Sequence, residues 1–212
     1  MNCFLKSETC KSQTRRTAAV LLAAGNASRF GTAKQSLLID GVPMVRRAAM
    51  AALDAGLSPV IVVIGAHGDA VEHSLGGLPV QLTGNPDWAS GMGSSLALGV
   101  RTAVATETLP HEVLVMLTDQ PGILAAELNA MIEAHASAPE RIRAARYEGH
   151  LGPPCLFPRA YFDELIAMDG TSGARRLLER HADCVDAHDL PSAAFDIDTP
   201  ADHAAWLAKQ GH

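Results

Sequence analysis

Aromatic side chains make up only 4% of this chain of 212 residues, so its core has to be built from aliphatic residues. Hydrophobic residues account for 48%, which is enough to bury one sizeable core. The four cysteines (Cys3, Cys10, Cys155 and Cys184) form no C-x-x-C pair, which argues against a zinc site or a disulfide framework. Because unpaired, reduced thiols are typical of intracellular proteins, we expect a cytoplasmic location.

Other classes of site and partner are also excluded. The nine histidines make no H-E-x-x-H pattern, and the net charge of −6 argues against a nucleic-acid-binding face. No apolar run reaches the about 18 residues that span a bilayer, so we expect no membrane partner. Residues 1–16 are polar and lack the apolar segment of a signal peptide, which predicts a disordered tail.

The most informative segment is a loop that follows the first apolar run. Residues 17–24 are typical of a buried strand, and a small, polar and basic loop then extends from Gly25 to Lys34. Gly25 and Gly31 allow the backbone to approach phosphate oxygens, while Arg29 and Lys34 supply the positive charge that a triphosphate requires. The spacing matches neither the P-loop nor the G-x-G-x-x-G fingerprint, and an ordinary loop with surface cations is the alternative.

The hydrophobic pattern alternates between strands and helices. It predicts strands over 17–24, 59–65, 79–82, 113–117, 141–147, 154–157 and 194–198, and helices over 44–53, 69–76, 96–104, 123–132, 159–167, 172–182 and from Pro200, with Thr199 as N-cap. This order predicts a single α/β domain with a mostly parallel, doubly wound, Rossmann-like sheet.

Asp119 directly follows the predicted strand over 113–117. Ligands of doubly wound sheets bind beyond the carboxyl ends of the strands, so Asp119 and the loop that ends at Lys34 can share one site. Asp119 can hold a nucleotide-bound Mg²⁺, and Asp196 and Asp198, on one face of an alternating segment, offer a second oxygen ligand. Taken singly, Asp119 also fits a turn, and the other two fit the start of a helix.

A second loop of small residues precedes the predicted helix over 96–104. Its backbone N–H groups at Gly91 and the hydroxyls of Ser94 and Ser95 can bind a base or a phosphate. A loop with a helix N-cap is the alternative, and Trp88 is assigned to packing.

These segments match one protein family. The stretch Leu22-Ala-Ala-Gly-Asn-Ala-Ser-Arg-Phe-Gly-Thr-Ala-Lys34 resembles the L-A-A-G-x-S-x-R-[MF]-G-x-x-K motif of nucleotidyltransferases with the GT-A-like fold. Further matches resemble the molybdenum cofactor cytidylyltransferase-like branch of the MobA-like NTP transferase superfamily. They are Asn85-Pro-Asp-Trp-x-x-Gly-Met-x-Ser-Ser-Leu96, Asp119-Gln-Pro121, Gly170-x-x-Gly-Ala-Arg175 and Asp196-Ile-Asp-Thr-Pro-Ala-Asp202.

The resemblance implies an Mg²⁺-dependent enzyme that moves CMP from CTP onto molybdopterin, releases pyrophosphate and serves a molybdoenzyme. It implies an NTP transferase domain over 17–212, with a nucleotide half over about 17–136 and an acceptor half over about 137–212. The implied catalytic residues are Lys34, Arg29 and Asp119, and the implied metal ligands are Asp119 with Asp198 or Asp196. The implied nucleotide-binding residues are Ala23, Ala24, Gly25, Ser28, Arg29, Gly31, Lys34, Gly91, Ser94 and Ser95, and the implied acceptor-binding residues are Gly152, Pro153, Gly173 and Arg175.

The resemblance is weakest around the acceptor. The family often has Cys at the position of Thr118, Gly-His-Pro at residues 152–154 and Gly-Asp-x-Gly-Ala-Arg at residues 170–175. Ala23-Ala24-Gly25 is similar to cytidylyl-transferring members, whereas guanylyl-transferring relatives usually carry Ala-Gly-Gly. The alternatives are transfer to a sugar or alcohol phosphate, use of GTP, a glycosyltransferase with a D-x-D motif, and a non-catalytic delivery protein.

Overall fold

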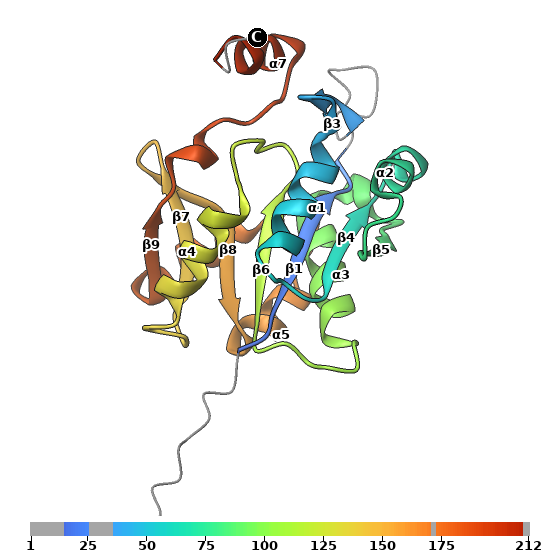
Figure 1. Cartoon of the computed structure of the whole chain (residues 1–212). Helices are drawn as coiled ribbons and strands as arrows, with labels where there is room; N and C mark the ends of the chain where they lie inside the picture. The colour runs from blue at the N-terminus through green and yellow to red at the C-terminus, as the bar shows by residue number, and fades with distance from the viewer. Residues whose placement is uncertain (1–14, 26–35, 171–172, 210–212) are drawn as a thin grey trace, which may run out of the picture.

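The computed structural model describes residues 15–25, 36–170 and 173–209, and the account below concerns these residues. Their centre is a seven-stranded sheet in the order β5-β4-β1-β6-β8-β7-β9 (Figure 1). Only β8 runs against its neighbours in this sheet, because the other ladders are parallel. The strands are β1 (Thr17–Ala23), β4 (Val60–Ile64), β5 (Gln81–Gly84), β6 (Glu112–Leu117), β7 (Ile142–Tyr147), β8 (His150–Pro158) and β9 (Val185–Asp189).

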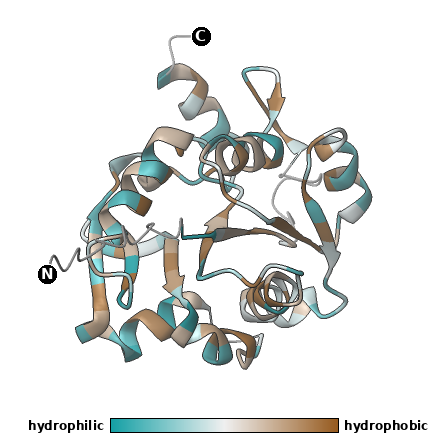
Figure 2. Ribbon diagram, turned by 60° about the horizontal axis from the view of Figure 1, so that its bottom comes forward, coloured by the Kyte–Doolittle hydropathy of each residue, from teal (hydrophilic) through white to brown (hydrophobic). Residues whose placement is uncertain are grey.

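Helices cover both faces of the sheet (Figure 2). The face with α1 (Met44–Asp54), α2 (Gly68–Leu75) and α4 (Ala125–His135) buries one hydrophobic cluster, and the face with α3 (Met92–Val104), α5 (Phe162–Ile166) and α6 (Ala174–Arg180) buries another. Successive residues of β1 point to opposite faces, so that Ala19 and Leu21 join the first cluster and Ala18 and Val20 the second. The predicted doubly wound, mostly parallel α/β fold is therefore confirmed.

A third, smaller cluster joins the C-terminal helix to the body. The helix α7 (Pro200–Lys209) places Trp206 against Ile39 of a two-stranded hairpin, which consists of β2 (Leu38–Ile39) and β3 (Val42–Pro43). Ile197 is fully buried in the same cluster. Thr199 is the N-cap of α7 as predicted, since its hydroxyl accepts the Asp202 backbone N–H at 3.2 Å.

One strand prediction is wrong. Residues 195–198 form no strand, because the apolar side chain of Ile197 packs into this third cluster and not onto the sheet. The last strand is instead β9, which the hydrophobic pattern did not predict. It lies at the sheet edge, where its exposed Asp189 pairs with Arg146 of β7 at 2.6 Å. The strand expected over 79–82 is β5, two residues further on.

A buried polar network ties the start of β1 to β6. Glu112 accepts the hydroxyl of Thr17 at 2.7 Å, lies 3.1 Å from His135 Nε2 and pairs with Arg15 at 3.0 Å. Burial by itself raises the pKa of Glu112, but the hydrogen bonds from His135 and Thr17 outweigh it and lower that pKa to about 2. The part of the predicted tail that the structure describes, Arg15 and Arg16, thus contacts the folded body.

Short 3₁₀ helices complete the described part of the chain. They are η2 (Trp88–Ser90), η3 (Arg159–Tyr161), η4 (Ala182–Cys184) and η5 (Pro191–Ala194). Among the described helices, none combines the length and apolar character needed to cross a membrane.

Candidate functional site

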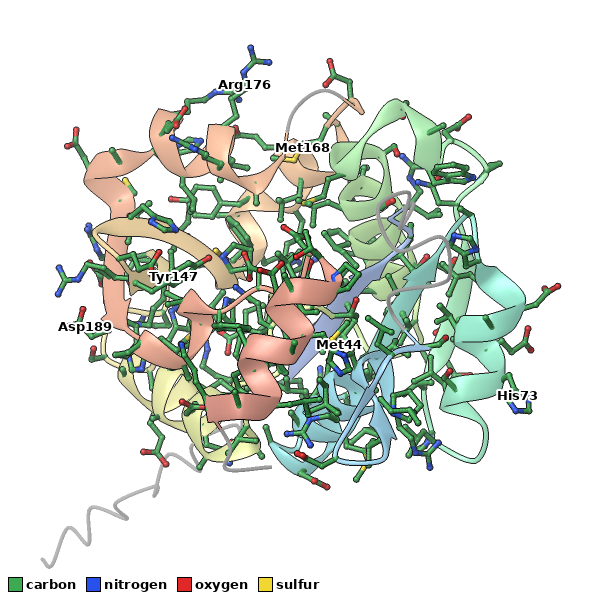
Figure 3. All side chains as sticks on the ribbon, turned by 90° about the horizontal axis from the view of Figure 1, so that it is seen from above. Met44, His73, Tyr147, Met168, Arg176 and Asp189 are labelled. Carbon is green, nitrogen blue, oxygen red and sulfur yellow. The ribbon has the colours of Figure 1, made fainter. Side chains whose placement is uncertain are left out.

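The predicted site residues Ala23, Ala24, Gly25 and Asp119 lie at the carboxyl edge of the sheet, onto which Figure 3 looks. Parallel pairing aligns the ends of β1, β4 and β6, with Ala23 opposite Ile64 and Leu22 opposite Leu117. The loop after β1 and the residues after β6 therefore begin side by side, as predicted. The predicted loop residues Ser28, Arg29, Gly31 and Lys34 lie outside the described residues.

Asp119 meets the C-terminal acidic segment at this edge. The backbone N–H of Ile197 donates a hydrogen bond of 2.9 Å to the backbone carbonyl oxygen of Asp119. Ile197 is buried, whereas Asp196 and Asp198 on either side of it are exposed. The structure therefore joins the segment that contains Asp196 and Asp198 to the backbone of Asp119, although that segment is not a strand.

The donor set fits a divalent cation that arrives with a nucleotide. Within the described ranges, no group of three or more His, Cys, Asp or Glu side chains is arranged to hold a metal ion by itself. Mg²⁺ in triphosphate sites usually takes one or two carboxylates and completes its shell with phosphate oxygens and water. Asp119 with Asp196 or Asp198 matches that need for hard oxygen donors, but it does not match a resident metal centre.

Three loops meet above the ends of β1, β4 and β5. A Cβ at Gly65, which follows β4, would lie 2.6 Å from the Ala24 carbonyl oxygen and 2.9 Å from the Trp88 Cβ. Only glycine allows this approach, so the loop after β1 is held against the loop that contains Trp88. Ala24 is buried and Gly25 is exposed, and Trp88 packs against the core, as expected.

The loop that contains Trp88 is shaped by a buried asparagine. The Asn85 amide donates to the hydroxyls of Ser94 and Ser95, each at 2.9 Å, and its oxygen accepts the Asp87 N–H at 3.0 Å. Ser95 is itself buried, so its hydroxyl stabilises the loop by accepting the hydrogen bond from Asn85. Binding of nucleotide by Ser94 and Ser95 stays a prediction. Asn85 was missed as a site residue, although it opens the Asn85-Pro-Asp-Trp motif.

The same loop also contacts the acceptor half. Gly91 has φ of +124°, and a Cβ there would collide with the carbonyl oxygen of Gly170. This contact sets the predicted nucleotide loop beside Gly170, and Gly173 is the residue before α6. Arg175, on the first turn of α6, is exposed and pairs with Glu179 at 2.9 Å. Its contact with an acceptor stays a prediction, as does that of Gly173.

Gln120 and Tyr147 are buried near Asp119, and neither was predicted as a site residue, although Gln120 lies in the Asp119-Gln-Pro121 motif. Gln120 Nε2 donates to the Ala193 carbonyl oxygen at 2.9 Å and to the Tyr147 hydroxyl at 3.4 Å. Burial raises the pKa of Tyr147, and the negative charges of Asp196 and Asp119 raise it further.

The Tyr147 hydroxyl also links the carboxylates to the predicted acceptor residues. It lies against Gly152, where a Cβ would overlap it, and Gly152 precedes Pro153 in β8. Tyr147 thus contacts both Gln120, the residue after Asp119, and the backbone at Gly152.

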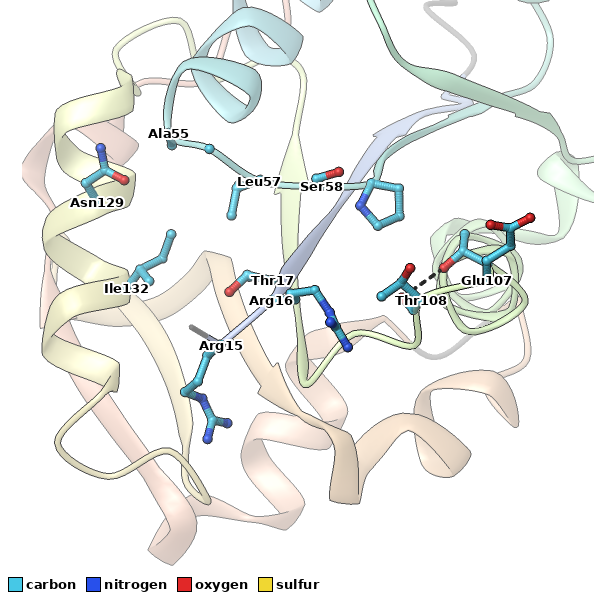
Figure 4. A pocket seen from close by; sticks show the side chains of 13 residues that line it. Arg15, Arg16, Thr17, Ala55, Leu57, Ser58, Glu107, Thr108, Asn129 and Ile132 are labelled. Carbon is cyan, nitrogen blue, oxygen red and sulfur yellow. Dashed lines mark hydrogen bonds between the residues drawn. The ribbon is translucent and has the colours of Figure 1, made fainter. Parts of the chain in front are cut away.

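A separate cavity opens at the opposite, amino edge of the sheet (Figure 4). Its volume is about 630 Å³, and it lies between α4 and the turn after α1, with Arg15 and Arg16 on its wall. None of the predicted site residues lines it. Arg15 is paired with Glu112, and the Arg16 guanidinium donates to the Leu109 carbonyl oxygen at 3.4 Å.

Comparison with known proteins gives consistent matches. A family model described as the MobA-like NTP transferase domain matches residues 19–185. The chain is 34% identical over 192 residues to the nicotine blue oxidoreductase of Paenarthrobacter nicotinovorans, covering 85% of this chain and 91% of that protein.

Among solved structures, Rv0371c of Mycobacterium tuberculosis H37Rv superposes with a TM-score of 0.77 at 25% identity over 92% of this chain and 98% of that one. A manganese complex of Rv0371c superposes with a TM-score of 0.76 at 23% identity, covering 91% and 98% of the two chains.

Proposed function

The chain belongs to the MobA-like NTP transferase family, and we propose that it transfers CMP from CTP to a phosphorylated acceptor and releases pyrophosphate. The observation that carries this proposal is the 2.9 Å hydrogen bond from Ile197 to Asp119, because it unites distant acidic residues at one edge of the sheet. Gly25, where the proposed phosphate-binding loop begins, follows β1 at that same edge. Molybdopterin is the proposed acceptor, on the strength of the sequence resemblance.

The carboxylates have a defined role in this proposal. Asp119, together with Asp198 or Asp196, would hold the divalent cation, Mg²⁺, that accompanies the triphosphate. When bound, this cation neutralises charge on the phosphate oxygens and so allows an anionic acceptor to approach. The manganese complex of Rv0371c supports a divalent cation in a protein with this fold.

The loop residues provide the remaining positive charge. The N–H groups of Gly25 and Gly31, the hydroxyl of Ser28, and the side chains of Arg29 and Lys34 would bind the triphosphate oxygens. An oxygen of the acceptor phosphate attacks the α-phosphorus in line, and the bond from the α-phosphorus to the bridging oxygen of the leaving pyrophosphate breaks. No general base is needed, because a phosphate monoester is already ionised near neutral pH.

The two halves of the chain would bind the two substrates. Ala23, Ala24 and the loop with Gly91, Ser94 and Ser95 would bind the nucleotide, and the form Ala23-Ala24-Gly25 supports CTP. Gly152, Pro153, Gly173 and Arg175 would bind the acceptor. The raised pKa of Tyr147 favours a neutral phenol, which adds no negative charge near an incoming phosphate.

An oxidoreductase is the second candidate, because the curated relative with 34% identity is named nicotine blue oxidoreductase. Such a reaction needs an electron donor, and the G-x-G-x-x-G fingerprint of dinucleotide-binding proteins is missing from the loop after β1. The two candidates therefore differ in their co-substrate. Release of pyrophosphate supports the transferase, and oxidation of a reduced nicotinamide by nicotine blue supports the oxidoreductase.

The test is incubation of the protein with each of the four NTPs, Mg²⁺ or Mn²⁺, and a panel of acceptors. The panel contains molybdopterin, a sugar phosphate and an alcohol phosphate, and products are identified by mass. We expect pyrophosphate and a cytidylylated pterin with CTP. Turnover with GTP alone would refute the base assignment, and absence of pyrophosphate with every NTP would refute the transferase. Asp54→Asn, which changes an exposed carboxylate at the end of α1, is the matched control for Asp119→Asn.

A further inference from the structure

The segment between Ala193 and Ile197 is fastened at both ends to two consecutive residues after β6. At one end, the Gln120 side chain donates its 2.9 Å hydrogen bond to the Ala193 carbonyl oxygen. At the other end, the Ile197 N–H donates its 2.9 Å bond to the Asp119 carbonyl oxygen. Only three residues separate these anchors, and one of them is Asp196. The position of Asp196 relative to Asp119 therefore depends on both bonds.

The second anchor is part of the backbone, but the first depends on the Gln120 side chain alone. Gln120 is 4% exposed, and among the described residues its Oε1 finds no hydrogen-bond partner. A buried amide with an unsatisfied oxygen is a poor choice for stability, because burial of that oxygen carries a desolvation penalty. The bond to the Ala193 carbonyl oxygen is therefore the main contact that this buried amide contributes.

Gln120 also reaches the Tyr147 hydroxyl, but that contact is longer, at 3.4 Å. The shorter bond to Ala193 is the one that acts on the acidic segment. Gly122 forms a further contact between the turn after β6 and the segment that contains Ala193. A Cβ at Gly122 would lie 2.6 Å from the Ser192 carbonyl oxygen. The turn after β6 and residues 192–197 thus form one connected unit.

We propose that Gln120 is a positioning residue, which fixes Asp196 against Asp119 through its hydrogen bond to Ala193. This inference rests on the proposed function, because it assigns Gln120 to the geometry of the carboxylates that would hold the nucleotide-bound cation. Partners that orient metal ligands without touching the metal typically change metal affinity or activity about 10–100-fold when they are mutated. Gln120 does not contact the reacting atoms in this scheme.

The test is Gln120→Met, which keeps a similar volume and removes the amide donor. The readout is binding of Mn²⁺ in the presence of CTP, followed by electron paramagnetic resonance of free Mn²⁺ and independent of turnover. We expect the dissociation constant for Mn²⁺ to rise at least about 10-fold, while the affinity for CTP measured without metal stays unchanged. Gln81→Met, at an exposed position of β5, is the matched control and should behave as wild type.

Two further variants test whether the effect on Mn²⁺ binding comes from the hydrogen bond between Gln120 and Ala193. Tyr147→Phe removes only the longer contact of Gln120 and should keep the Mn²⁺ affinity. Gln120→Asn keeps an amide that is one methylene too short to reach Ala193, and it should weaken Mn²⁺ binding as Gln120→Met does. It also replaces Gln120→Met if that variant does not fold.

Failure of the inference can be told apart from failure of the proposed function. Wild-type protein that neither binds Mn²⁺ with CTP nor releases pyrophosphate overturns the proposed function, and the inference with it. Wild-type protein that binds Mn²⁺, together with a Gln120→Met or Gln120→Asn variant of equal Mn²⁺ affinity, overturns the inference alone. A loss of Mn²⁺ affinity in Tyr147→Phe as large as that in Gln120→Met overturns the assignment to the Ala193 bond.

Discussion

Glu112 allows a stability prediction whose size follows from the structure. Its carboxylate is buried among Thr17, His135 and Arg15, and its pKa falls from 4.5 to about 2 on folding. Because the folded-state pKa is the lower one, Glu112 stabilises the protein above the unfolded-state pKa, and this stabilisation is lost as pH falls from about 4.5 to about 2. The shift corresponds to about 3 kcal/mol in the free energy of unfolding.

The perturbation is Glu112→Gln, and the assay is urea denaturation between pH 7 and pH 2. We expect the variant to be less stable than wild type by about 3 kcal/mol near neutral pH. The difference should shrink as the pH falls toward 2, because the Glu112 carboxylate of the unfolded wild-type chain becomes protonated while that of the folded protein is still ionised. Glu72→Gln, at an exposed position of α2, should show no such difference. A stability difference between wild type and Glu112→Gln that stays constant from pH 6 to pH 3 would refute the reasoning.

Three further predictions concern the carboxyl edge. Lys34→Ala should lower the rate of pyrophosphate release by about 10²–10³-fold with an unchanged melting temperature, and a near-normal rate at saturating metal would remove Lys34 from the mechanism. Asn85→Leu should destabilise the protein by about 1–3 kcal/mol in urea denaturation, because the hydroxyls of Ser94 and Ser95 lose their hydrogen-bond donor. The same variant should raise the KM for CTP, and an unchanged KM would show that this loop does not bind the nucleotide. Gly91→Ala should lower stability by about 1–3 kcal/mol, since its φ of +124° and its contact with Gly170 exclude a side chain, and a melting temperature equal to that of wild type would contradict this.

The fold could be predicted where a strand or helix is marked by apolar residues within its own short stretch of sequence. The apolar runs of β1, β4 and β6 specify strands that are covered on both faces. The edge strand β9 carries alternating polar residues and is held by ion pairs such as Arg146 to Asp189, which no local pattern indicates. Residues 195–198 were assigned to a strand because apolar and acidic residues alternate there. That alternation correctly predicted which side chains are exposed, but the partner of Ile197 is the cluster with Trp206.

Some residues of the candidate site could likewise be predicted from the sequence, and others could not. Asp119, Asp196 and Asp198 could be selected because carboxylates after a buried strand and in a short alternating segment stand out in the sequence. Gln120 lies in the Asp119-Gln-Pro121 motif, but its contact could not be predicted, because the Ala193 carbonyl that it bonds is 73 positions away. Tyr147 likewise reaches the site only through the pairing of β7 with β8. Such contacts between distant segments are decided by tertiary packing.

The most direct test of the central claim is a crystal structure of the protein with CTP and Mn²⁺, in which anomalous scattering locates the metal. The account predicts a metal peak between the triphosphate and the carboxylates of Asp119 and Asp198 or Asp196, at the carboxyl edge of the sheet. A nucleotide bound instead at the amino edge, in the cavity beside Arg15 and Arg16, would contradict it, as would a metal peak with no contact to Asp119.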